Sequence, residues 1–303
     1  MSAERASLAP EAVYGFPENA EAAGALATAL RLAHIPVEVH RFPDGESKVR
    51  VPEGAAHAIV LRSLHEPNAK LMELAFTAAA LRDVGTLRIT LVAPYLSYMR
   101  QDKAFRTGEA VSQRVMGEFL ADRFDRFVSI DPHLHRTPVL ADVFRGKPAL
   151  TLTAAPAISS HIRQRALGGA LLLLGPDEES QPWVSAVAGP LGASWATGVK
   201  RRYGDRDVKI ELPADLDVRA RNVIMVDDVI SSGGTLRTLA GLLRQHAPAS
   251  LEAYTTHALF SSDDEDAMHR AGVDAITSCN TVPHRTNGID VTPLLAEALR
   301  AWR

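Results

Sequence analysis

The sequence has almost no cysteine and no long apolar run, and both absences narrow the class of protein. Cys279 is the single cysteine among 303 residues, which excludes an internal disulfide framework and favours a reducing compartment. No apolar stretch reaches the ~18 residues that a membrane-spanning helix requires. The opening residues, MSAERASLAPEA, also lack the apolar core of a secretory signal. We therefore expect a cytoplasmic protein with no membrane partner.

An excess of charge of either sign is missing as well. The 33 lysine and arginine residues nearly balance 36 acidic residues, so the net charge is −3. This balance gives no reason to expect a nucleic-acid partner, and local basic clusters must be explained as sites. Hydrophobic residues make up 46% of the chain, the usual share in a soluble globular protein.

What is present is an alternation of short apolar runs with helical patterns. This order predicts an α/β fold of βαβ units, with mainly parallel sheets flanked by helices. Strands are predicted at 12–16, 36–42, 58–63, 88–93, 126–130, 148–152, 169–175, 193–197, 222–226, 250–255 and 275–278. Helices are predicted at 18–33, 67–83, 111–123, 155–166, 181–190, 235–246, 264–271 and 292–302.

Two domains are expected, because about eleven strands exceed what one compact sheet usually holds. We place the boundary near residues 150–155, where LTLTAAPA precedes a new helix. This gives an N-terminal domain of residues 1–152 and a C-terminal domain of residues 153–303. The sequence does not decide which domain the last helix packs against.

The most informative segment is VDDVISSGGT, residues 226–235, between the apolar strand NVIMV and an amphipathic helix. Asp227 and Asp228 stand at the carboxyl end of the strand, where open α/β sheets bind ligands. Two glycines and three hydroxyl residues then open the helix, whose free N–H groups and dipole favour an anion. They are Ser231, Ser232, Gly233, Gly234 and Thr235. The pattern indicates a ligand with a phosphate and sugar hydroxyls; the alternative is a plain turn that Thr235 caps.

Two further loops follow predicted strands in the N-terminal half. In residues 93–103, Arg100 and Lys103 are suited to phosphate, while Gln101 and Asp102 can hydrogen-bond a base or hydroxyl. Two nearby tyrosines can supply a stacking face. In residues 129–135 (SIDPHLH), Asp131, His133 and His135 alternate, a pattern compatible with a hard cation such as Mg²⁺. Zinc lacks a third ligand nearby. The alternatives are a solvated loop and a histidine pair capping a strand.

The C-terminal half adds an acid and a basic triplet. Gly-Pro breaks the strand before Asp177, and this carboxylate is a natural ligand for a metal or hydroxyl; Glu178 and Glu179 equally suit a first helical turn. Residues 200–202 (KRR) indicate an anion-facing flap that closes over a reaction, or a hairpin with a basic edge. Residues 41–47 (RFPDGES) taken alone predict only a hairpin turn.

Together, and in this order, these motifs resemble the ribose-phosphate diphosphokinases, also called phosphoribosyl pyrophosphate synthetases. The corresponding pieces are FPDGE at 42–46, PYLSYMRQDK at 94–103, DPH at 131–133, GPD at 175–177, KRR at 200–202, VDDVISSGGT at 226–235, THALFS at 256–261 and NTVPH at 280–284. The resemblance implies two phosphoribosyltransferase-type domains, of which the first has lost its ribose-phosphate loop. It also implies transfer of the diphosphate of ATP to O1 of ribose 5-phosphate, with Mg²⁺, giving phosphoribosyl pyrophosphate and AMP.

The same resemblance implies the roles of individual residues. Metal would be held by His133, Asp177 and the nearby Asp131, and the catalytic cations would be Lys200 and Arg202 on the flap. Ribose 5-phosphate would be bound by Asp227, Asp228, Ser231, Ser232, Gly233, Gly234 and Thr235. ATP would be bound by Arg100, Gln101, Asp102 and Lys103, and its adenine by Phe42, Asp44 and Glu46. Because the family builds its ATP site across a dimer interface, the resemblance also implies a homodimer or higher homo-oligomer.

The chain departs from many members of that family in the ribose-phosphate turn. Many members have an aspartate at the position of Ser231. Archaeal-type members have a serine there, as this chain does, and residues 208–218 (VKIELPADLDV) also resemble the archaeal type. Glu178 and Glu179 add acids beside Asp177, which repel polyphosphate unless a cation intervenes. Two alternative functions are a non-catalytic regulatory homologue and a base-transferring phosphoribosyltransferase. Retention of the cations at 200–202 opposes the first, and the two-domain length opposes the second.

Overall fold

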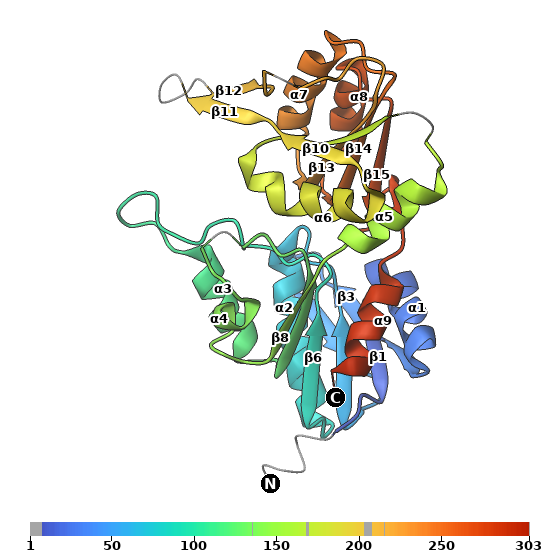
Figure 1. Cartoon of the computed structure of the whole chain (residues 1–303). Helices are drawn as coiled ribbons and strands as arrows, with labels where there is room; N and C mark the ends of the chain where they lie inside the picture. The colour runs from blue at the N-terminus through green and yellow to red at the C-terminus, as the bar shows by residue number, and fades with distance from the viewer. Residues whose placement is uncertain (1–7, 135, 168–169, 203–207, 215, 303) are drawn as a thin grey trace. The chain divides into compact units, whose positions relative to one another are not determined.

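The computed structural model describes residues 8–134, 136–167, 170–202, 208–214 and 216–302 (Figure 1). At 200–202 and 208–210 the backbone alone is described. The described residues form two compact units. Unit 1 comprises Met1–Thr153, Thr281–Pro283 and Val291–Arg303; unit 2 comprises Ala154–Asn280 and His284–Asp290.

Unit 1 is built on a parallel six-stranded sheet of order β2-β1-β5-β6-β7-β8. The strands are β1 (Ala12–Gly15), β2 (Ala33–Pro36), β5 (His57–Leu61), β6 (Arg88–Val92), β7 (Arg126–Ile130) and β8 (Ala149–Leu152). The helices are the 3-10 turn η2 (Pro17–Asn19), α1 (Ala20–Leu30), α2 (Pro67–Asp83), α3 (Ser112–Ala121), α4 (Leu140–Val143) and α9 (Thr292–Ala301). Every residue of β5 and β6 is buried, as expected for central parallel strands covered on both faces.

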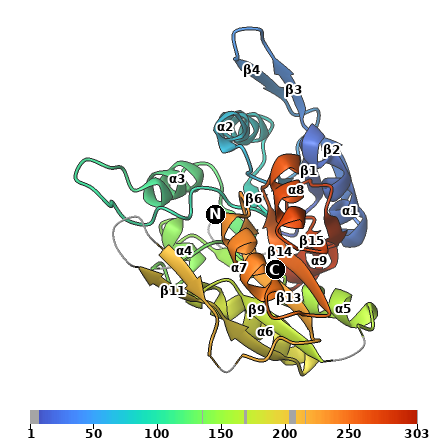
Figure 2. The ribbon, with the colours of Figure 1, turned by 90° about the horizontal axis from the view of Figure 1, so that it is seen from above.

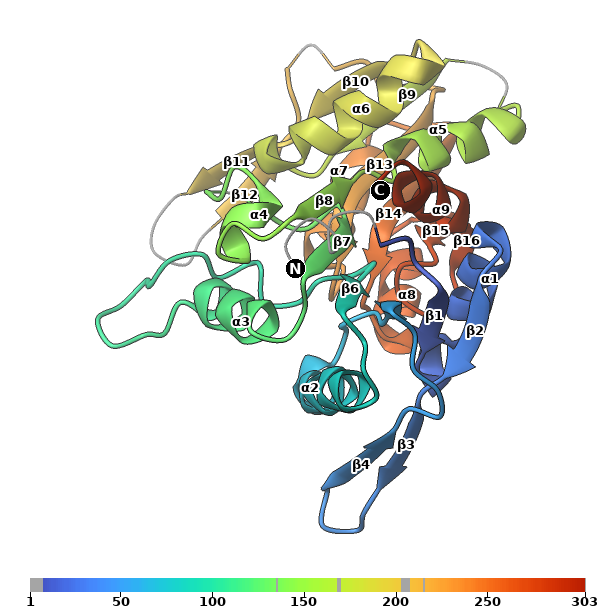
Figure 3. The same ribbon diagram turned by 90° about the horizontal axis from the view of Figure 1, so that it is seen from below.

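A separate antiparallel hairpin, β3 (Glu38–Arg41) and β4 (Ser47–Arg50), belongs to unit 1. Figures 2 and 3 show it extending away from the sheet, beside α2. The single strand predicted at 36–42 is therefore wrong: the segment holds the last residue of β2 and the whole of β3. Pro36 is the last residue of β2 and lies on an edge strand, where the missing N–H of a proline is tolerated.

Unit 2 has a second parallel six-stranded sheet, of order β10-β9-β13-β14-β15-β16. Its strands are β9 (Leu171–Gly175), β10 (Ser194–Thr197), β13 (Asn222–Ile230), β14 (Ser250–Ala258), β15 (Ala275–Cys279) and β16 (Asn287–Ile289). Its helices are α5 (Ala155–Gln164), the 3-10 turn η3 (Glu178–Ser180), α6 (Gln181–Leu191), α7 (Gly234–Arg244) and α8 (Ser262–Arg270). A two-stranded antiparallel hairpin, β11 (Val199–Arg202) and β12 (Val208–Glu211), completes the unit.

The predicted α/β fold class is confirmed, and the eight predicted helices all occur within a few residues of their predicted bounds. The sequence did not predict β4, β16 or the four-residue α4, which are too short for a periodic pattern. Within the described residues, no helix is long and apolar enough to cross a membrane.

The prediction of a C-terminal domain running to residue 303 is wrong at its end, because α9 belongs to unit 1. Leu295 and Leu299 are buried on α9, and the guanidinium of Arg300 donates to the carbonyl of Ala29 at the end of α1 at 2.6 Å. Trp302 lies under the guanidinium of Arg126, 5.0 Å from the ring centroid. The apolar face of α9 therefore completes the core of the first sheet.

A buried histidine in unit 1 predicts a pH dependence of stability. His57 contacts the carbonyl of Leu8 at 2.9 Å and the hydroxyl of Thr90 at 2.8 Å, and burial lowers its pKa from 6.5 to about 4. Between pH 6.5 and about 4, His57 therefore binds a proton in the unfolded chain but stays neutral in the folded protein. Stability from this group is complete above pH 6.5 and is lost as the pH falls toward 4. Urea midpoints of the wild type should fall over this range more steeply than those of His57→Gln; parallel curves would contradict the assignment.

Candidate active site

The carboxyl edge of the second sheet gathers Asp177, the acids Asp227 and Asp228, and the glycine turn that the sequence singled out. Strands β9 and β13 are parallel neighbours, with Met225 opposite Leu174. Asp177 follows β9, whereas Asp227 and Asp228 lie near the end of β13. The turn to α7 then starts at Ser231. Adjacent strand ends thus bring the acids and the glycine turn to the edge where open α/β sheets bind ligands.

Three carboxylates lie close enough at this edge to influence one another. Burial, followed by the carboxylates of Asp228 and Asp177, raises the pKa of Asp227 well above its ordinary value. Asp228 is itself buried, its N–H donates to Asp227 Oδ1 at 3.1 Å, and its carbonyl accepts from Thr255 at 3.1 Å. This concentration of negative charge suits a cation or a ligand rich in hydroxyl donors.

Asp177 also has a local role. Its side chain accepts a hydrogen bond from the N–H of Glu179 at 3.0 Å, and it caps η3 together with Ser180. Glu178 and Glu179 therefore occupy a first turn, the alternative that the sequence left open. The carboxylate of Asp177 is buried at the strand tip, and Glu178 and Glu179 are exposed.

The two glycines of the turn are required for different reasons. Gly233 has φ = 66°, and an added Cβ would lie 2.5 Å from Met268 Sδ, so the fold itself demands glycine there. At Gly234 the nearest atoms, on Arg237 and Ser232, would be 3.8 Å from an added Cβ. The fold tolerates a side chain at Gly234, so its absence keeps the first N–H groups of α7 open to an anion.

The basic flap is a hairpin, as one reading of KRR allowed. In its backbone register, Lys200 pairs with Ile210, Arg201 with Lys209, and Arg202 with Val208. Alternation along a strand places positions 200 and 202 on one face and position 201 on the other. The side chains of Lys200 and Arg202 lie outside the described part of the structure.

In unit 1, the DPH segment leaves the carboxyl end of β7. Asp131 is buried and adopts φ = 38°, an uncommon conformation outside glycine, while its N–H donates to Leu152 at 2.8 Å. His133 is half-buried two residues later, and His135 lies outside the described residues. No group of three or more His, Cys, Asp or Glu side chains with metal-site geometry occurs among the described residues.

The RQDK loop of unit 1 is partly engaged by its own chain. Asp102 is paired with Arg136 at 2.9 Å, and its side chain is only 2% exposed. Gln101 accepts a hydrogen bond from the hydroxyl of Ser112. Arg100 and Lys103 are exposed. The two cations are therefore available to a ligand, whereas Asp102 chiefly holds the loop to the segment after DPH.

Tyr95 and Tyr98 precede the RQDK loop, and the sequence suggested that they supply a stacking face for a ligand. Tyr98 is half-buried, adopts φ = 65° and donates its hydroxyl to Asn68. Tyr95 is also half-buried. Tyr98 therefore has a packing role in unit 1.

Residues 41–47 form the predicted hairpin turn. Phe42 N donates to Glu46 O at 2.8 Å, Gly45 N donates to Phe42 O at 2.9 Å, and Asp44 Oδ1 accepts from Glu46 N at 3.1 Å. Phe42 is 40% exposed, unusually high for a phenylalanine, and the carboxylates of Asp44 and Glu46 are exposed. The tip therefore presents an aromatic ring and two acids to solvent.

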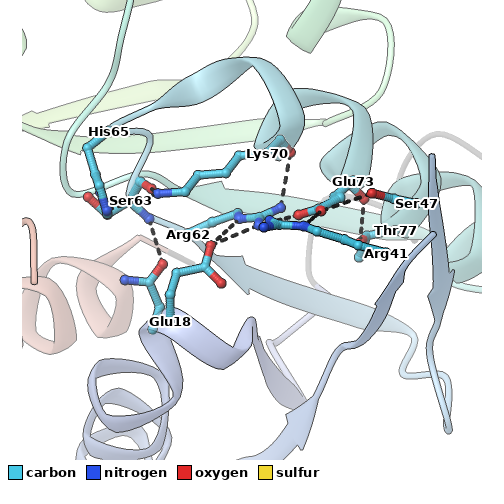
Figure 4. A network of polar contacts seen from close by, with 10 residues as sticks. Glu18, Arg41, Ser47, Arg62, Ser63, His65, Lys70, Glu73 and Thr77 are labelled. Atoms are coloured by element: carbon cyan, nitrogen blue, oxygen red, sulfur yellow. Dashed lines mark hydrogen bonds and ion pairs between the residues drawn. The ribbon is translucent and has the colours of Figure 1, made fainter. Parts of the chain in front are cut away.

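Sequence reasoning missed a buried network of charges beside this hairpin (Figure 4). Glu73 on α2 accepts from Arg41 Nε at 2.9 Å, from Ser47 Oγ at 3.1 Å and from the buried Arg62. Burial opposes the ionisation of Glu73, but the arginines outweigh it and hold the pKa of Glu73 below its ordinary value. Arg62 is also paired with Glu18 at 2.8 Å.

A pocket of about 640 Å³ opens beside this network, lined by Pro17, Glu18, Val39, Arg41, Arg62, His65, Glu66, Ala69, Lys70 and Glu73. Burial lowers the pKa of Lys70 to about 8. A sequence signal existed: Lys70, Glu73 and Thr77 are spaced three and four residues apart and form one polar stripe within the otherwise apolar stretch 69–81 of α2. All three are buried.

Comparisons with known proteins agree with the fold. A family model described as the N-terminal domain of ribose phosphate pyrophosphokinase matches residues 12–122, and a phosphoribosyl transferase domain model matches residues 147–292. The ribose-phosphate pyrophosphokinase of Methanopyrus kandleri is 34% identical over 266 residues, covering 87% of this chain and 90% of that protein. That of Thermococcus kodakarensis is 35% identical over 260 residues, covering 86% and 90%. Both relatives are archaeal, as the segment at 208–218 suggested.

A solved structure matches across both units. The crystal structure of phosphoribosylpyrophosphate synthetase from Mycobacterium smegmatis aligns with a TM-score of 0.84 at 26% identity, covering 97% of this chain and 98% of that chain. The similarity therefore extends over the whole length of the chain.

Proposed function

The chain belongs to the ribose-phosphate pyrophosphokinase family, and we propose that it transfers the β,γ-diphosphate of ATP to O1 of ribose 5-phosphate. The products are phosphoribosyl pyrophosphate and AMP. The observation that carries this proposal is the edge of unit 2, where buried acids stand beside the open N-terminus of α7. This edge offers both an anion site and acceptors for sugar hydroxyls.

In this proposal, ribose 5-phosphate binds with its phosphate at the glycine turn before α7 and with its hydroxyls beside Asp227 and Asp228. The first N–H groups of α7 and the exposed hydroxyls of Ser231 and Ser232 suit the phosphate. Asp227 and Asp228 accept hydrogen bonds from the ribose hydroxyls. Anchoring the remote phosphate fixes O1, so that binding energy serves the alignment of the reacting atoms.

In the reaction, O1 attacks the β-phosphorus, the bond from that phosphorus to the α,β-bridging oxygen breaks, and AMP leaves with that oxygen. The proton of the O1 hydroxyl passes to solvent. Such phosphoryl chemistry needs in-line alignment and neutralised charge more than covalent help from the protein. Lys200 and Arg202, on one face of the β11–β12 hairpin, supply positive charge to the transferring group.

Mg²⁺ fits the donor chemistry of the acids at this edge. Burial, followed by the neighbouring carboxylates of Asp228 and Asp177, raises the pKa of Asp227, and a hard divalent cation with oxygen ligands would relieve the repulsion between these carboxylates. Mg²⁺ keeps several waters and phosphate ligands, so a complete protein cage is not required. In unit 2 Asp177 would contribute a ligand to the ion, which would neutralise the polyphosphate. Asp131 and His133 are the metal ligands that the resemblance implies in unit 1.

The ATP contacts come from unit 1. Arg100 and Lys103 are exposed cations suited to phosphates. Gln101 belongs to the same loop, which Asp102 holds through its pair with Arg136. The hairpin tip, with Phe42, Asp44 and Glu46, suits adenine through its aromatic face and its acceptors.

We further propose that the protein is a homodimer or higher homo-oligomer in the cytoplasm. The outer face of α2 exposes Met72 (49%) and Phe76 (42%), large apolar side chains that a second copy would cover. An ATP site shared between subunits requires such an assembly. Cys279 is buried and is the single cysteine of the sequence, so it forms no internal disulfide, which fits a reducing compartment.

The experiment that tests the activity is an assay of AMP formation from ATP, ribose 5-phosphate and Mg²⁺, with each component omitted in turn. AMP should form only in the complete mixture. ATP binding without AMP release would instead support the non-catalytic homologue, and diphosphate release that depends on an added base would support a base-transferring enzyme.

Gly234→Val should raise the KM for ribose 5-phosphate about 100-fold, because two charge-assisted hydrogen bonds to the phosphate contribute about 1.5 kcal/mol each. An added Cβ meets no atom closer than 3.8 Å, so the melting temperature should change little. The Kd for ATP is the internal control. A variant that loses ATP binding instead would show that the two ligand sites are wrongly assigned.

A further inference from the structure

We propose that Glu73 is a positioning residue that holds the tip of the β3–β4 hairpin in the orientation required for the nucleotide (Figure 4). The inference rests on the proposed function, in which the tip contacts adenine. It concerns residues that do not themselves touch the ligand.

Glu73 accepts hydrogen bonds from both strands of the hairpin, at a single cross-strand pair of residues. Arg41 and Ser47 are register partners, the last pair before the turn of residues 42–46. Both reach Glu73 Oε1, at 2.9 Å and 3.1 Å. One buried oxygen therefore fixes the two ends of the loop that carries Phe42, while the tip beyond it is exposed.

The other side of Glu73 is fixed by the body of unit 1. Its Oε2 pairs with Arg62, whose side chain is fully buried. Arg62 is held in turn by Glu18 at 2.8 Å, by the carbonyl of Lys70 at 3.1 Å and by the ring of Phe16, 3.7 Å from the centroid. Because Glu73 is anchored in this way, it transmits the position of the sheet and of α2 to the hairpin.

Apolar contacts alone leave the tip less constrained. Val39 and Val49 of the hairpin are register partners and pack against the core of unit 1, but they lie further from the turn than Arg41 and Ser47. Without the hydrogen bonds from Arg41 and Ser47 to Glu73, the hairpin should remain packed on unit 1 through these valines, whereas its tip should sample more orientations. Ordering the tip then becomes part of the free energy of binding ATP.

The test compares Arg41→Met, Ser47→Ala and the double variant with wild type. We expect the Kd and KM for ATP to rise about tenfold in the double variant, because the tip must be ordered on binding. The KM for ribose 5-phosphate and the kcat at saturating ATP should stay within about twofold. Ser47→Thr, which keeps the hydroxyl on a strand, should retain wild-type affinity for ATP.

Arg50→Met is the matched control. Arg50 pairs with Glu38 at 2.6 Å at the opposite end of the same hairpin, on the surface, so its loss should leave the Kd for ATP unchanged. Hydrogen exchange of the amides of residues 42–46 should accelerate in the double variant and not in the control.

Two results would overturn the inference: an unchanged Kd for ATP in the double variant, or an equal loss of affinity for ribose 5-phosphate. The Kd for ATP is measured without turnover. A wild-type protein that binds ATP but forms no AMP would therefore refute the proposed activity while leaving this comparison decisive.

Discussion

Replacing Lys200 with alanine is expected to lower kcat about 10³-fold, the scale of a cation that stabilises a transferring phosphoryl group in the transition state. The Kd for ribose 5-phosphate should change by less than about twofold, because that ligand is anchored at the α7 turn. Single-turnover measurements of AMP formation, with ribose 5-phosphate binding followed by calorimetry, separate the two effects.

The hairpin register supplies a matched control for this variant. Arg201 and Lys209 are register partners on the two strands, and both positions lie on the face opposite to position 200. Lys209→Ala removes the same charge from the same hairpin and should leave kcat within about threefold of wild type. Equal losses in Lys200→Ala and Lys209→Ala would mean that the flap acts through its overall charge. Equal losses of kcat and of ribose 5-phosphate affinity would remove the transition-state role of Lys200.

Glu73→Ala is expected to destabilise unit 1 by about 3–5 kcal/mol, because it leaves the buried guanidinium of Arg62 without its main counter-charge. Arg62 has no exposed side-chain surface, so water cannot replace the lost carboxylate. Glu18, 31% exposed, keeps only part of the pairing. Because the two units can unfold separately, the measurement needs a probe of unit 1 alone.

Trp302 is such a probe, since Trp183 and Trp195 belong to unit 2. Urea unfolding followed by Trp302 fluorescence, in a background with phenylalanine at both other positions, reports on unit 1. Glu38→Ala breaks an exposed pair and should change stability by about 0–1 kcal/mol. Combining Glu73→Ala with Arg62→Leu should recover part of the loss, because the fully buried guanidinium is removed together with its counter-charge. A loss for Glu73→Ala no larger than that for Glu38→Ala would refute the expectation.

Local patterns in the sequence predicted most of the fold. Apolar runs such as those of β6 and β7 indicated buried parallel strands, and the spacing of leucines predicted α7 almost to the residue. Turn chemistry identified the hairpin at 41–47 and the glycine turn at the start of α7. Asp177, Asp227, Asp228 and the glycine turn then met at one sheet edge, because parallel strands end on the same side.

Other features depended on contacts between residues far apart in the chain. The sequence did not distinguish Gly233, which the side chain of Met268 requires, from Gly234, which the fold leaves free. Nor did it indicate that Arg136, 34 residues away, pairs with Asp102, a predicted ATP ligand.

The sequence by itself therefore determined the α/β class, the order of the elements and the family resemblance, because periodicity and turn chemistry act over a few residues. Only the tertiary structure decided that α9 joins the first sheet and that Glu73 holds Arg41, 32 residues before it, and Arg62. These outcomes follow from the burial of apolar surface and charge between distant segments. The free energy of that burial depends on which surfaces meet in the folded chain, and no local pattern specifies it.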